Sequence, residues 1–512
     1  MNDFMIEGGH LRLADLETQD TARPTYRLSE GARKRMEETA STVNRLAGSD
    51  HPYYGLNTGF GALANRHIGN RQIELQYNLA RSHSTGTGSP LAPERVRRIL
   101  LLKANSLAIG LSGVRPIIVE HLLAFLNQDV LPVIPERGSV GASGDLAPLA
   151  HLVLALIGEG EATCAGSKIE GARVPQAAGV PVLELKAKEA LALLNGTQVS
   201  TALAVEGLLG GSRLLQAAIA IGALTTEALC GSHQPFDPRI HAARGQPGQM
   251  GVARHFNRLL PETEILNSHR DCPRVQDPYS VRCQPQVLGM VEDTLSHAGR
   301  ILAYEINGVT DNPLVFGDDI VSGGNFHAEP VGAVADFLSI ALAEIGALSE
   351  RRIDLLMREV NPRLPPFLAR DPGVESGFMI AHVSAAALAS ENKTLAHPAT
   401  VDSLPTSAGQ EDHVSMAPWA GYKLLTIVDN VETILAIELL AASAGIDFLR
   451  PLKTSPPLES LQAKVRERIP PHLGDRRLDR DIEALRGLLR DARLWNQVVP
   501  EEHSRLNEGA LP

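Results

Sequence analysis

Cysteine is scarce in this chain, which has four among 512 residues. Cys164, Cys230, Cys272 and Cys283 form no Cys-x-x-Cys pair, and they are too few to cross-link a chain of this length. The sequence therefore excludes a disulfide framework. A reducing compartment, the cytoplasm, is the expected location.

The sequence also lacks an excess of positive charge, since 48 Lys and Arg stand against 59 Asp and Glu. The net charge of −11 argues against broad binding to nucleic acids or anionic membranes, so small molecules are the expected partners. The first twenty residues lack the basic start and apolar run of a secretory signal. The most apolar stretch, 201–224, is interrupted by Glu206 and Arg213, which predicts a packed helix rather than a membrane span.

Alternating polar and apolar runs, the pattern of half-buried strands, are scarce as well. From about residue 114 onward, apolar residues recur at spacings of three and four, most over lengths too great for strands, which predicts helices. These helices are expected at 117–125, 187–194, 200–229, 287–307, 331–357, 381–393 and 424–444, with a charged tail helix around 478–493.

A chain of this length exceeds one typical core. We expect a mainly α protein with a loop-rich N-terminal head (1–110), a central helical bundle (111–450) and a peripheral helical C-terminal segment (451–512). The helix expected at 331–357 is apolar around much of its circumference and needs burial on more than one side. Self-association is therefore expected.

The run GSVGASGDLAPLAH, from Gly138 to His151, contains the tripeptide Ala142-Ser143-Gly144. If the Gly144 nitrogen meets the Ala142 carbonyl carbon, ring closure and loss of two waters give 4-methylideneimidazol-5-one (MIO), an electrophile. Gly144 offers an unhindered nitrogen with wide backbone freedom, and Ser143 has a β-oxygen to expel. Taken alone, the same tripeptide is a common polar turn.

The residues after the tripeptide predict a helix from Leu146 to Ile157. Asp145 is a plausible N-cap, and Pro148 is tolerated in the first turn. The tripeptide would then lie at the positive end of a helix, which favours electron density arriving at the ring.

Further motifs lie along the chain at YGLNTGFG from Tyr54, LALLNGTQ from Leu191, VQDPYSVRCQPQ from Val275, TDNPLVF from Thr310, GGNFHAEP from Gly323 and QEDHVSM from Gln410. In order and spacing they resemble the motifs of the aromatic amino acid ammonia-lyase family, from about Tyr54 to the region of Lys423. The resemblance implies a helical aspartase-like architecture, MIO formed from residues 142–144 with no external cofactor, and a homotetramer with shared active sites.

Elimination of ammonia from an amino acid needs a strong base beside the electrophile, because the β-hydrogen is barely acidic. Tyr54 resembles the family's catalytic base, provided that positive charge or hydrogen bonds lower its pKa from about 10. Tyr53 is the less favoured neighbour. Arg282 resembles the residue that holds the substrate carboxylate, for which a planar guanidinium is suited.

Asn195, Gln276 and Tyr279 resemble family residues that hydrogen-bond the MIO ring and the substrate. The pair Asn195-Gly196 equally predicts a turn that ends a helix, and the two interpretations are compatible. Phe326 is expected to flank the substrate ring, and its alternative is a core position.

Substrate choice is expected to depend on His83, in ARSHSTGTG, and on Glu411, because an imidazole needs a hydrogen-bonding partner at each nitrogen. Relatives that act on phenylalanine or tyrosine carry other residues at these two positions. The resemblance therefore implies conversion of L-histidine to urocanate and ammonia, the first step of histidine degradation. A tyrosine or phenylalanine ammonia-lyase and an aromatic 2,3-aminomutase stay open as alternatives. An inactive scaffold is disfavoured, because Ser143, Tyr54 and Arg282 are all present.

The chain departs from the family pattern near its last motif. Gly409 stands where Asn is common before the Gln-Glu pair, and Trp419 and Tyr422 follow in a segment that is more usually small and basic. These two aromatic residues are candidates to reshape one wall of the site and so the substrate range.

The sequence does not match the motifs of three other classes of protein. Gly59 and Gly61 fit a dinucleotide fingerprint loosely, but no strand-like run precedes them. His327 and Glu329 resemble the His-x-Glu of zinc deaminases, but no Pro-Cys-x-x-Cys follows, so no metal site is expected. Asp145 removes the match to a hydrolase G-x-S-x-G elbow.

Overall fold

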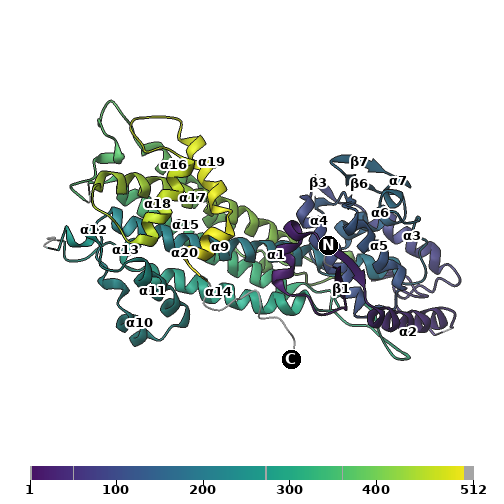
Figure 1. Ribbon diagram of the computed structural model, residues 1–512. Helices are drawn as coiled ribbons and strands as arrows, with labels where there is room; N and C mark the ends of the chain where they lie inside the picture. The colour runs from purple at the N-terminus through teal and green to yellow at the C-terminus, as the bar shows by residue number, and fades with distance from the viewer. Residues whose placement is uncertain (1–2, 50, 271–273, 360, 501–512) are drawn as a thin grey trace.

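The protein is elongated and mostly helical, with long helices running along its middle (Figure 1). The computed structural model describes residues 3–49, 51–270, 274–359 and 361–500. Its α-helices are α1 (Leu13–Ala22), α2 (Glu30–Ala47), α3 (Gln72–His83), α4 (Pro93–Ala108), α5 (Pro116–Asn127), α6 (Leu146–Leu156), α7 (Arg173–Ala177), α8 (Glu189–Leu194), α9 (Gln198–Ala228), α10 (Pro238–Arg244), α11 (Pro247–Leu259), α12 (Glu264–Asn267), α13 (Tyr279–Arg282), α14 (Gln284–Glu305), α15 (Glu329–Met357), α16 (Met379–Leu395), α17 (Ala417–Leu449), α18 (Pro456–Arg468), α19 (Leu478–Leu489) and α20 (Ala492–Val498).

The strands are short and form small separate sheets. They are β1 (Asp3–Ile6), β2 (Thr25–Leu28), β3 (Thr87–Pro90), β4 (Leu131–Pro132), β5 (Pro135–Arg137), β6 (Glu161–Cys164), β7 (Ser167–Glu170), β8 (Leu314–Phe316) and β9 (Asp319–Val321). β1 pairs with β2 in parallel, whereas β3 with β5, β4 with β6, β6 with β7, and β8 with β9 are antiparallel. The mainly α fold class is confirmed.

The helices α9, α14, α15 and α17 pack together as the central bundle. Glycines let α9 and α17 approach closely. A Cβ atom on Gly207 of α9 would lie 2.2 Å from Leu424, and one on Gly421 of α17 would lie 2.7 Å from Leu203. This explains why the most apolar stretch of the sequence contains glycines, which otherwise weaken a helix.

Each helix expected from apolar periodicity is present, with shifted ends. α17 begins at Ala417, before the predicted start, and Pro418 occupies its first turn, where proline is well tolerated. α8 begins at Glu189 because Lys188 has a φ of +68°, which interrupts a helix. The predicted tail helix is divided in two, and Asp491 caps the second part by accepting hydrogen bonds from the amides of Arg493 and Leu494.

The N-terminal region contains helices as well as the expected loops. α4 is buried along most of its length although it carries Arg97, Arg98 and Lys103, whose charges hide its apolar periodicity in the sequence. The division of the chain near residues 110 and 450 stays a prediction. Buried apolar side chains between Ile6 and Val499 form one main cluster.

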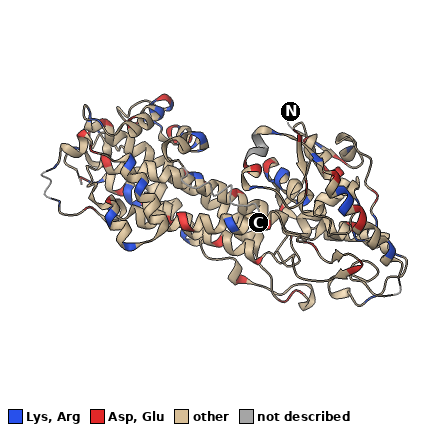
Figure 2. Ribbon diagram, turned by 60° about the horizontal axis from the view of Figure 1, so that its bottom comes forward, with Lys and Arg blue, Asp and Glu red and all other residues tan. Residues whose placement is uncertain are grey.

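Two helices, α9 and α15, are long and apolar enough to cross a membrane by length and composition. The most apolar window of α9 is 89% buried inside the protein and that of α15 is 61% buried, and core helices of folded proteins pass the same test. Basic and acidic residues are interspersed at both ends of the molecule, and the central helices carry few (Figure 2).

A buried ion pair joins α15 to α17. Arg352 donates two hydrogen bonds to the Glu438 carboxylate, at 2.5 and 2.7 Å, and both side chains are inaccessible to solvent. Glu438 also accepts hydrogen bonds from Thr225 and Ser349. The pair therefore ties α9, α15 and α17 together.

Replacing Arg352 with methionine is expected to lower the free energy of unfolding by about 3–5 kcal/mol, because it leaves a buried carboxylate without its cation. Urea denaturation followed by circular dichroism measures the change. Arg45→Met removes an exposed pair with Asp318 and is the matched control, with an expected loss of about 0–1 kcal/mol. Equal losses in the two variants would contradict the assigned role of the buried pair.

Candidate active site

The tripeptide Ala142-Ser143-Gly144 lies in the loop between β5 and α6, pressed against the turn that precedes α9. Gly144 has a φ of +72°, and a Cβ atom there would lie 2.3 Å from the carbonyl oxygen of Gly196. The amide of Asp145 donates a hydrogen bond to that same oxygen at 2.7 Å. The backbone therefore requires glycine at position 144 for both its conformation and its close approach.

Asp145 is the N-cap residue of α6, as the sequence predicts, but its side chain makes no capping hydrogen bond. Its buried carboxylate instead accepts hydrogen bonds from the amide and hydroxyl of Ser200, at 2.7 and 2.8 Å, and from Ser139 at 3.2 Å. Burial raises the pKa of Asp145, and the hydrogen bonds from Ser200 and Ser139 oppose that rise. The N-cap position is therefore predicted correctly, but the side chain of Asp145 binds α9 rather than its own helix.

Asn195 fixes the backbone of the tripeptide from the other side. It is the C-cap residue of α8, and its side-chain amide donates a 2.6 Å hydrogen bond to the Ser143 carbonyl oxygen. Lys103 donates hydrogen bonds to the carbonyl oxygens of Ala192 and Asn195, at 2.9 and 2.7 Å. Burial lowers the pKa of Lys103 to about 7. Asn195 is thus both a helix-ending residue and a contact of the tripeptide.

Glu411 contacts the serine itself, across 268 positions of sequence. Its Oε1 accepts a 2.7 Å hydrogen bond from the Ser143 hydroxyl, and its Oε2 accepts hydrogen bonds from Thr406 and Ser407 at 2.6 and 2.9 Å. Burial raises the pKa of Glu411, but the hydrogen bonds from Thr406, Ser143 and Ser407 outweigh it, so that the pKa lies below its usual value. Glu411 is therefore ionised at neutral pH.

Tyr54 and His83 are linked through Phe60. The ring of Phe60 stacks on Tyr54, with centroids 6.0 Å apart, and meets His83 edge-on at 5.4 Å. The Nδ1 atom of His83 lies 2.9 Å from the Leu79 carbonyl oxygen, to which it donates its proton, so Nε2 keeps a lone pair. Burial lowers the pKa of His83, which favours the neutral ring.

The Tyr54 phenol oxygen accepts a hydrogen bond from the amide of Gly61 at 3.1 Å. Burial raises the pKa of Tyr54, the Gly61 amide opposes this, and the charge of Glu411 adds to the rise. The groups of one chain therefore do not give Tyr54 the lowered pKa that a tyrosinate base needs. Tyr53 packs instead on the small hydrophobic cluster of Val43 and Leu56.

A cavity of about 320 Å³ brings most of the predicted site residues together. It is lined by Tyr54, Phe60, Gly61, Ala64, Ala142, Ser143, Leu191, Asn195, Asn312, Ser322, Gly323, Phe326, His327, Gln410, Glu411, Asp412 and His413. Phe326 is therefore a wall residue of the cavity rather than a core residue. His83 lies behind Phe60.

Several lining residues are not among those predicted from the sequence. Phe60 and Gly61 belong to the motif that begins at Tyr54, and Gln410 and His413 belong to the motif around Glu411. Their place in these motifs was the feature of the sequence that could have identified them. Gly61 acts through its backbone amide, so its residue type does not reveal this role.

Gln276, Tyr279 and Arg282 do not join this cavity. They belong to α13 and the segment before it, at the opposite end of the molecule from α3 and α6 (Figure 1). Gln276 and Tyr279 are exposed, and the Arg282 guanidinium lies over the Tyr279 ring at 4.7 Å. The Nε atom of Arg282 is shielded from solvent and has no hydrogen-bond partner within the described residues.

The three departures from the family pattern lie around the same motif. Gly409 has a φ of +84°, a conformation that suits glycine and asparagine, so the exchange of these residues keeps the turn. Trp419 and Tyr422 lie on α17, outside the described lining of the cavity.

The comparison with known proteins agrees with this geometry. The profile of a family described as aromatic amino acid lyase matches residues 11–467. The chain belongs to the aromatic amino acid lyase family. Every residue of the candidate site falls within that match. One curated relative, histidine ammonia-lyase of Rhodospirillum rubrum, is 53% identical over 503 residues, which cover 97% of this chain and 98% of the relative.

Two solved structures show how far the family fold extends. Histidine ammonia-lyase from Trypanosoma cruzi superposes with a TM-score of 0.90 at 40% identity, covering 99% of this chain and 97% of that one. Tyrosine aminomutase from Streptomyces globisporus also reaches 0.90, at 34% identity, with 98% and 99% covered. Lyases and aminomutases of this family therefore share one backbone, and reaction and substrate depend on side chains.

Proposed function

We propose that this protein is a histidine ammonia-lyase, which eliminates ammonia from L-histidine to give urocanate. The observation that carries the proposal is the ionised Glu411, which contacts Ser143 on one side of the cavity, with neutral His83 behind Phe60. A protonated imidazole that reaches both groups could donate one N–H to the Glu411 carboxylate and the other to the lone pair on Nε2 of His83. A phenyl or phenol ring cannot use both partners.

The residues of the loop fit MIO. Gly144 has the backbone conformation and the space that only glycine tolerates, and Asn195 would hold the carbonyl oxygen of the ring. When formed, MIO supplies the electrophile that activates the amino acid for loss of ammonia. The N-terminus of α6 directly follows the tripeptide, and its positive end favours electron density there.

Tyr54 is the proposed base that removes the β-proton. The Gly61 amide stabilises its anionic form, but burial and Glu411 act against ionisation. The described lining of the cavity contains no lysine or arginine. Positive charge that lowers the pKa of Tyr54 must therefore come from outside this cavity, and Arg282 of a second copy of the chain is the proposed source.

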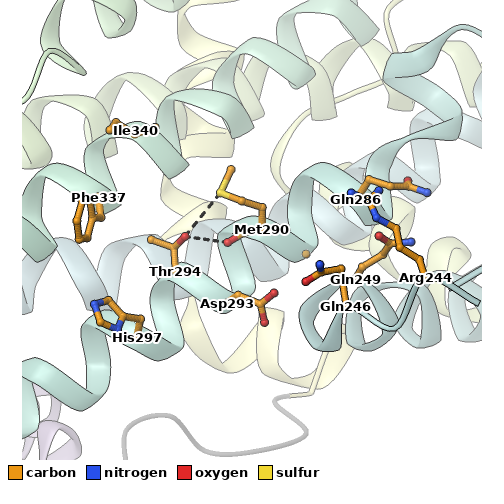
Figure 3. A pocket seen from close by; sticks show the side chains of 11 residues that line it. Arg244, Gln246, Gln249, Gln286, Met290, Asp293, Thr294, His297, Phe337 and Ile340 are labelled. Carbon is orange, nitrogen blue, oxygen red and sulfur yellow. Dashed lines mark hydrogen bonds between the residues drawn. The ribbon is translucent and has the colours of Figure 1, made fainter. Parts of the chain in front are cut away.

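We infer a homotetramer whose active sites combine the Tyr54 and Ser143 loops of one copy with α13 of another. This arrangement would give a role to Arg282, whose shielded Nε atom has no hydrogen-bond partner among the described residues of its own chain. The bundle also exposes apolar side chains along α14 and α15, including Met290, Phe337 and Ile340 beside a second cavity of about 560 Å³ (Figure 3). Such a face suits burial against another copy.

Mixing two inactive variants tests the shared site. Tyr54→Phe and Arg282→Ala chains, unfolded together and refolded, are expected to recover roughly a quarter of the wild-type activity, because random assembly joins intact residues from different copies in that share of sites. Each variant refolded alone is the control and stays inactive. Absence of recovery in tetramers shown by mass spectrometry to be mixed would contradict the shared site.

We place the enzyme in the cytoplasm. Cys164, Cys230 and Cys283 are free thiols, as a reducing compartment allows, and Cys272 lies outside the described residues. L-histidine is the proposed substrate.

Substrate choice can be separated from carboxylate binding with two variants. Arg282→Lys is expected to lower kcat/KM for histidine, tyrosine and phenylalanine alike. An ammonium cannot reproduce the guanidinium fork, and all three substrates carry the carboxylate. His83→Leu is expected to damage histidine turnover selectively, since a lost hydrogen bond to a buried ring nitrogen costs about 1–3 kcal/mol. Formation of the conjugated acrylate, followed by absorbance, gives kcat/KM for each amino acid. An unchanged ratio of histidine to tyrosine in His83→Leu, or wild-type preference for tyrosine, favours a tyrosine lyase or aminomutase instead.

A further inference from the structure

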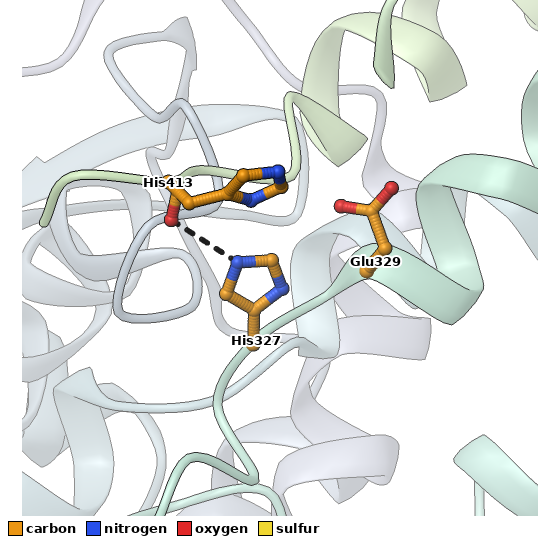
Figure 4. Close-up of side chains that lie close together, drawn as sticks. All are labelled: His327, Glu329 and His413. Atoms are coloured by element: carbon orange, nitrogen blue, oxygen red, sulfur yellow. Dashed lines mark hydrogen bonds between the residues drawn. The ribbon is translucent and has the colours of Figure 1, made fainter. Parts of the chain in front are cut away.

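A cluster of metal-ligating side chains lies on the wall of the active-site cavity. His327 and Glu329 stand where the loop enters α15, and His413 stands on the loop before α17, 86 positions after His327. One ligand atom from each of the three side chains lies within 4.8 Å of the other two (Figure 4). Only the fold brings His413 to the other two, so a search for short motifs could not find the set.

A backbone hydrogen bond sets the tautomer of His327. Its Nε2 lies 3.2 Å from the His413 carbonyl oxygen, which can only accept, so Nε2 carries the proton and Nδ1 keeps its lone pair. Figure 4 shows Nδ1 on the side of the ring that faces Glu329. Metal-binding histidines are commonly oriented in this way, with one nitrogen donating to a backbone carbonyl and the other on the metal.

Glu329 provides a second observation that indicates a ligand. Its Oε2 is shielded from solvent and accepts no hydrogen bond from the described residues. A buried carboxylate oxygen without a partner is costly, and a place in the first turn of α15 compensates only part of that cost. A cation among the three side chains would satisfy this oxygen.

We propose that His327, Glu329 and His413 bind one divalent transition-metal ion of the Zn²⁺ class. Two imidazoles and one carboxylate form a ligand set that Zn²⁺ accepts, whereas Mg²⁺ and Ca²⁺ prefer oxygen ligands. His327 and His413 both line the active-site cavity, so a coordination position left open by the protein faces that cavity. The site goes beyond the proposed lyase activity and does not depend on it.

Metal binding can be measured directly. Tag-free protein, stripped with a chelator, is titrated with Zn²⁺ by calorimetry, and Co²⁺ loading is followed by visible absorption. One ion per chain is expected. His413→Ala and Glu329→Gln are each expected to lower the affinity for Zn²⁺ at least tenfold. A loss of roughly this size follows even when only a residue that hydrogen-bonds a metal ligand is changed.

His397→Ala is the matched control, because His397 is exposed and lies outside the cluster, and it should bind Zn²⁺ like the wild type. Circular dichroism establishes that each variant is folded. Glu329→Gln keeps the size of the side chain, so it tests the site even if His413→Ala misfolds. No Zn²⁺ bound by the wild type, or equal affinity in wild type and folded Glu329→Gln, would overturn the proposal.

Discussion

Ser143→Ala is expected to abolish turnover of every amino acid while leaving the fold intact. The substitution removes the oxygen that must be expelled to form MIO, so no electrophile can arise. Structurally it removes one hydrogen bond, between the Ser143 hydroxyl and Glu411, in a partly exposed loop, and such a bond contributes about 0.5–1.5 kcal/mol. Activity assays and thermal denaturation of the same preparation separate the two effects.

Intact-mass measurement provides an independent readout of the same chemistry. Wild-type protein should be lighter than its sequence by two water molecules, and Ser143→Ala should not show the loss of both. Active wild-type protein with the unmodified mass would disprove the cyclisation.

Tyr54→Phe is expected to lower kcat by roughly a hundredfold or more, the share that general-base catalysis commonly contributes. The phenyl ring keeps its stacking on Phe60, so the substrate cavity should persist. Tyr53→Phe is the matched control, because Tyr53 packs on the Val43 cluster, and it should retain near-normal activity. Normal kcat in Tyr54→Phe would move the base to another residue.

The pH profile tests the same assignment. A base must be deprotonated, so the active form of Tyr54 grows as the pH rises towards its pKa, which burial raises and which Arg282 of a second copy is proposed to lower. Wild-type kcat/KM is therefore expected to increase on the alkaline side of neutral, by up to about tenfold per pH unit below the pKa. Tyr54→Phe should lose this rise in its residual activity.

Apolar periodicity was sufficient to find the helices of the bundle, because α9, α15 and α17 bury residues at helical spacings over many turns. It was insufficient for α4, where Arg97, Arg98 and Lys103 are buried through contacts made elsewhere in the chain. Helix ends set by a single backbone angle, as at Lys188, have no apolar signal at all.

In the active site, too, only part of the arrangement can be predicted from the sequence. Motif resemblance identified Ser143, Asn195 and Glu411, and in the fold Asn195 and Glu411 each form a hydrogen bond with Ser143. The position of Asp145 at the N-cap of α6 could be predicted, but its hydrogen bonds with Ser200 could not, because Ser200 becomes its partner only after α9 has packed against the loop. Contacts between distant segments, as at His327 and His413, depend on the whole fold.

The anchoring of the Ser143 loop has a consequence for the order of events in the life of the chain. The groups that hold the loop, Asn195, Gly196 and Ser200, are synthesised more than fifty positions after it and act only when α8 and α9 are in place. The proposed cyclisation is therefore expected to follow folding, so that a nascent or misfolded chain would carry no electrophile able to react with other cellular nucleophiles. Formation of the proposed electrophile would thus be restricted to chains that have already folded.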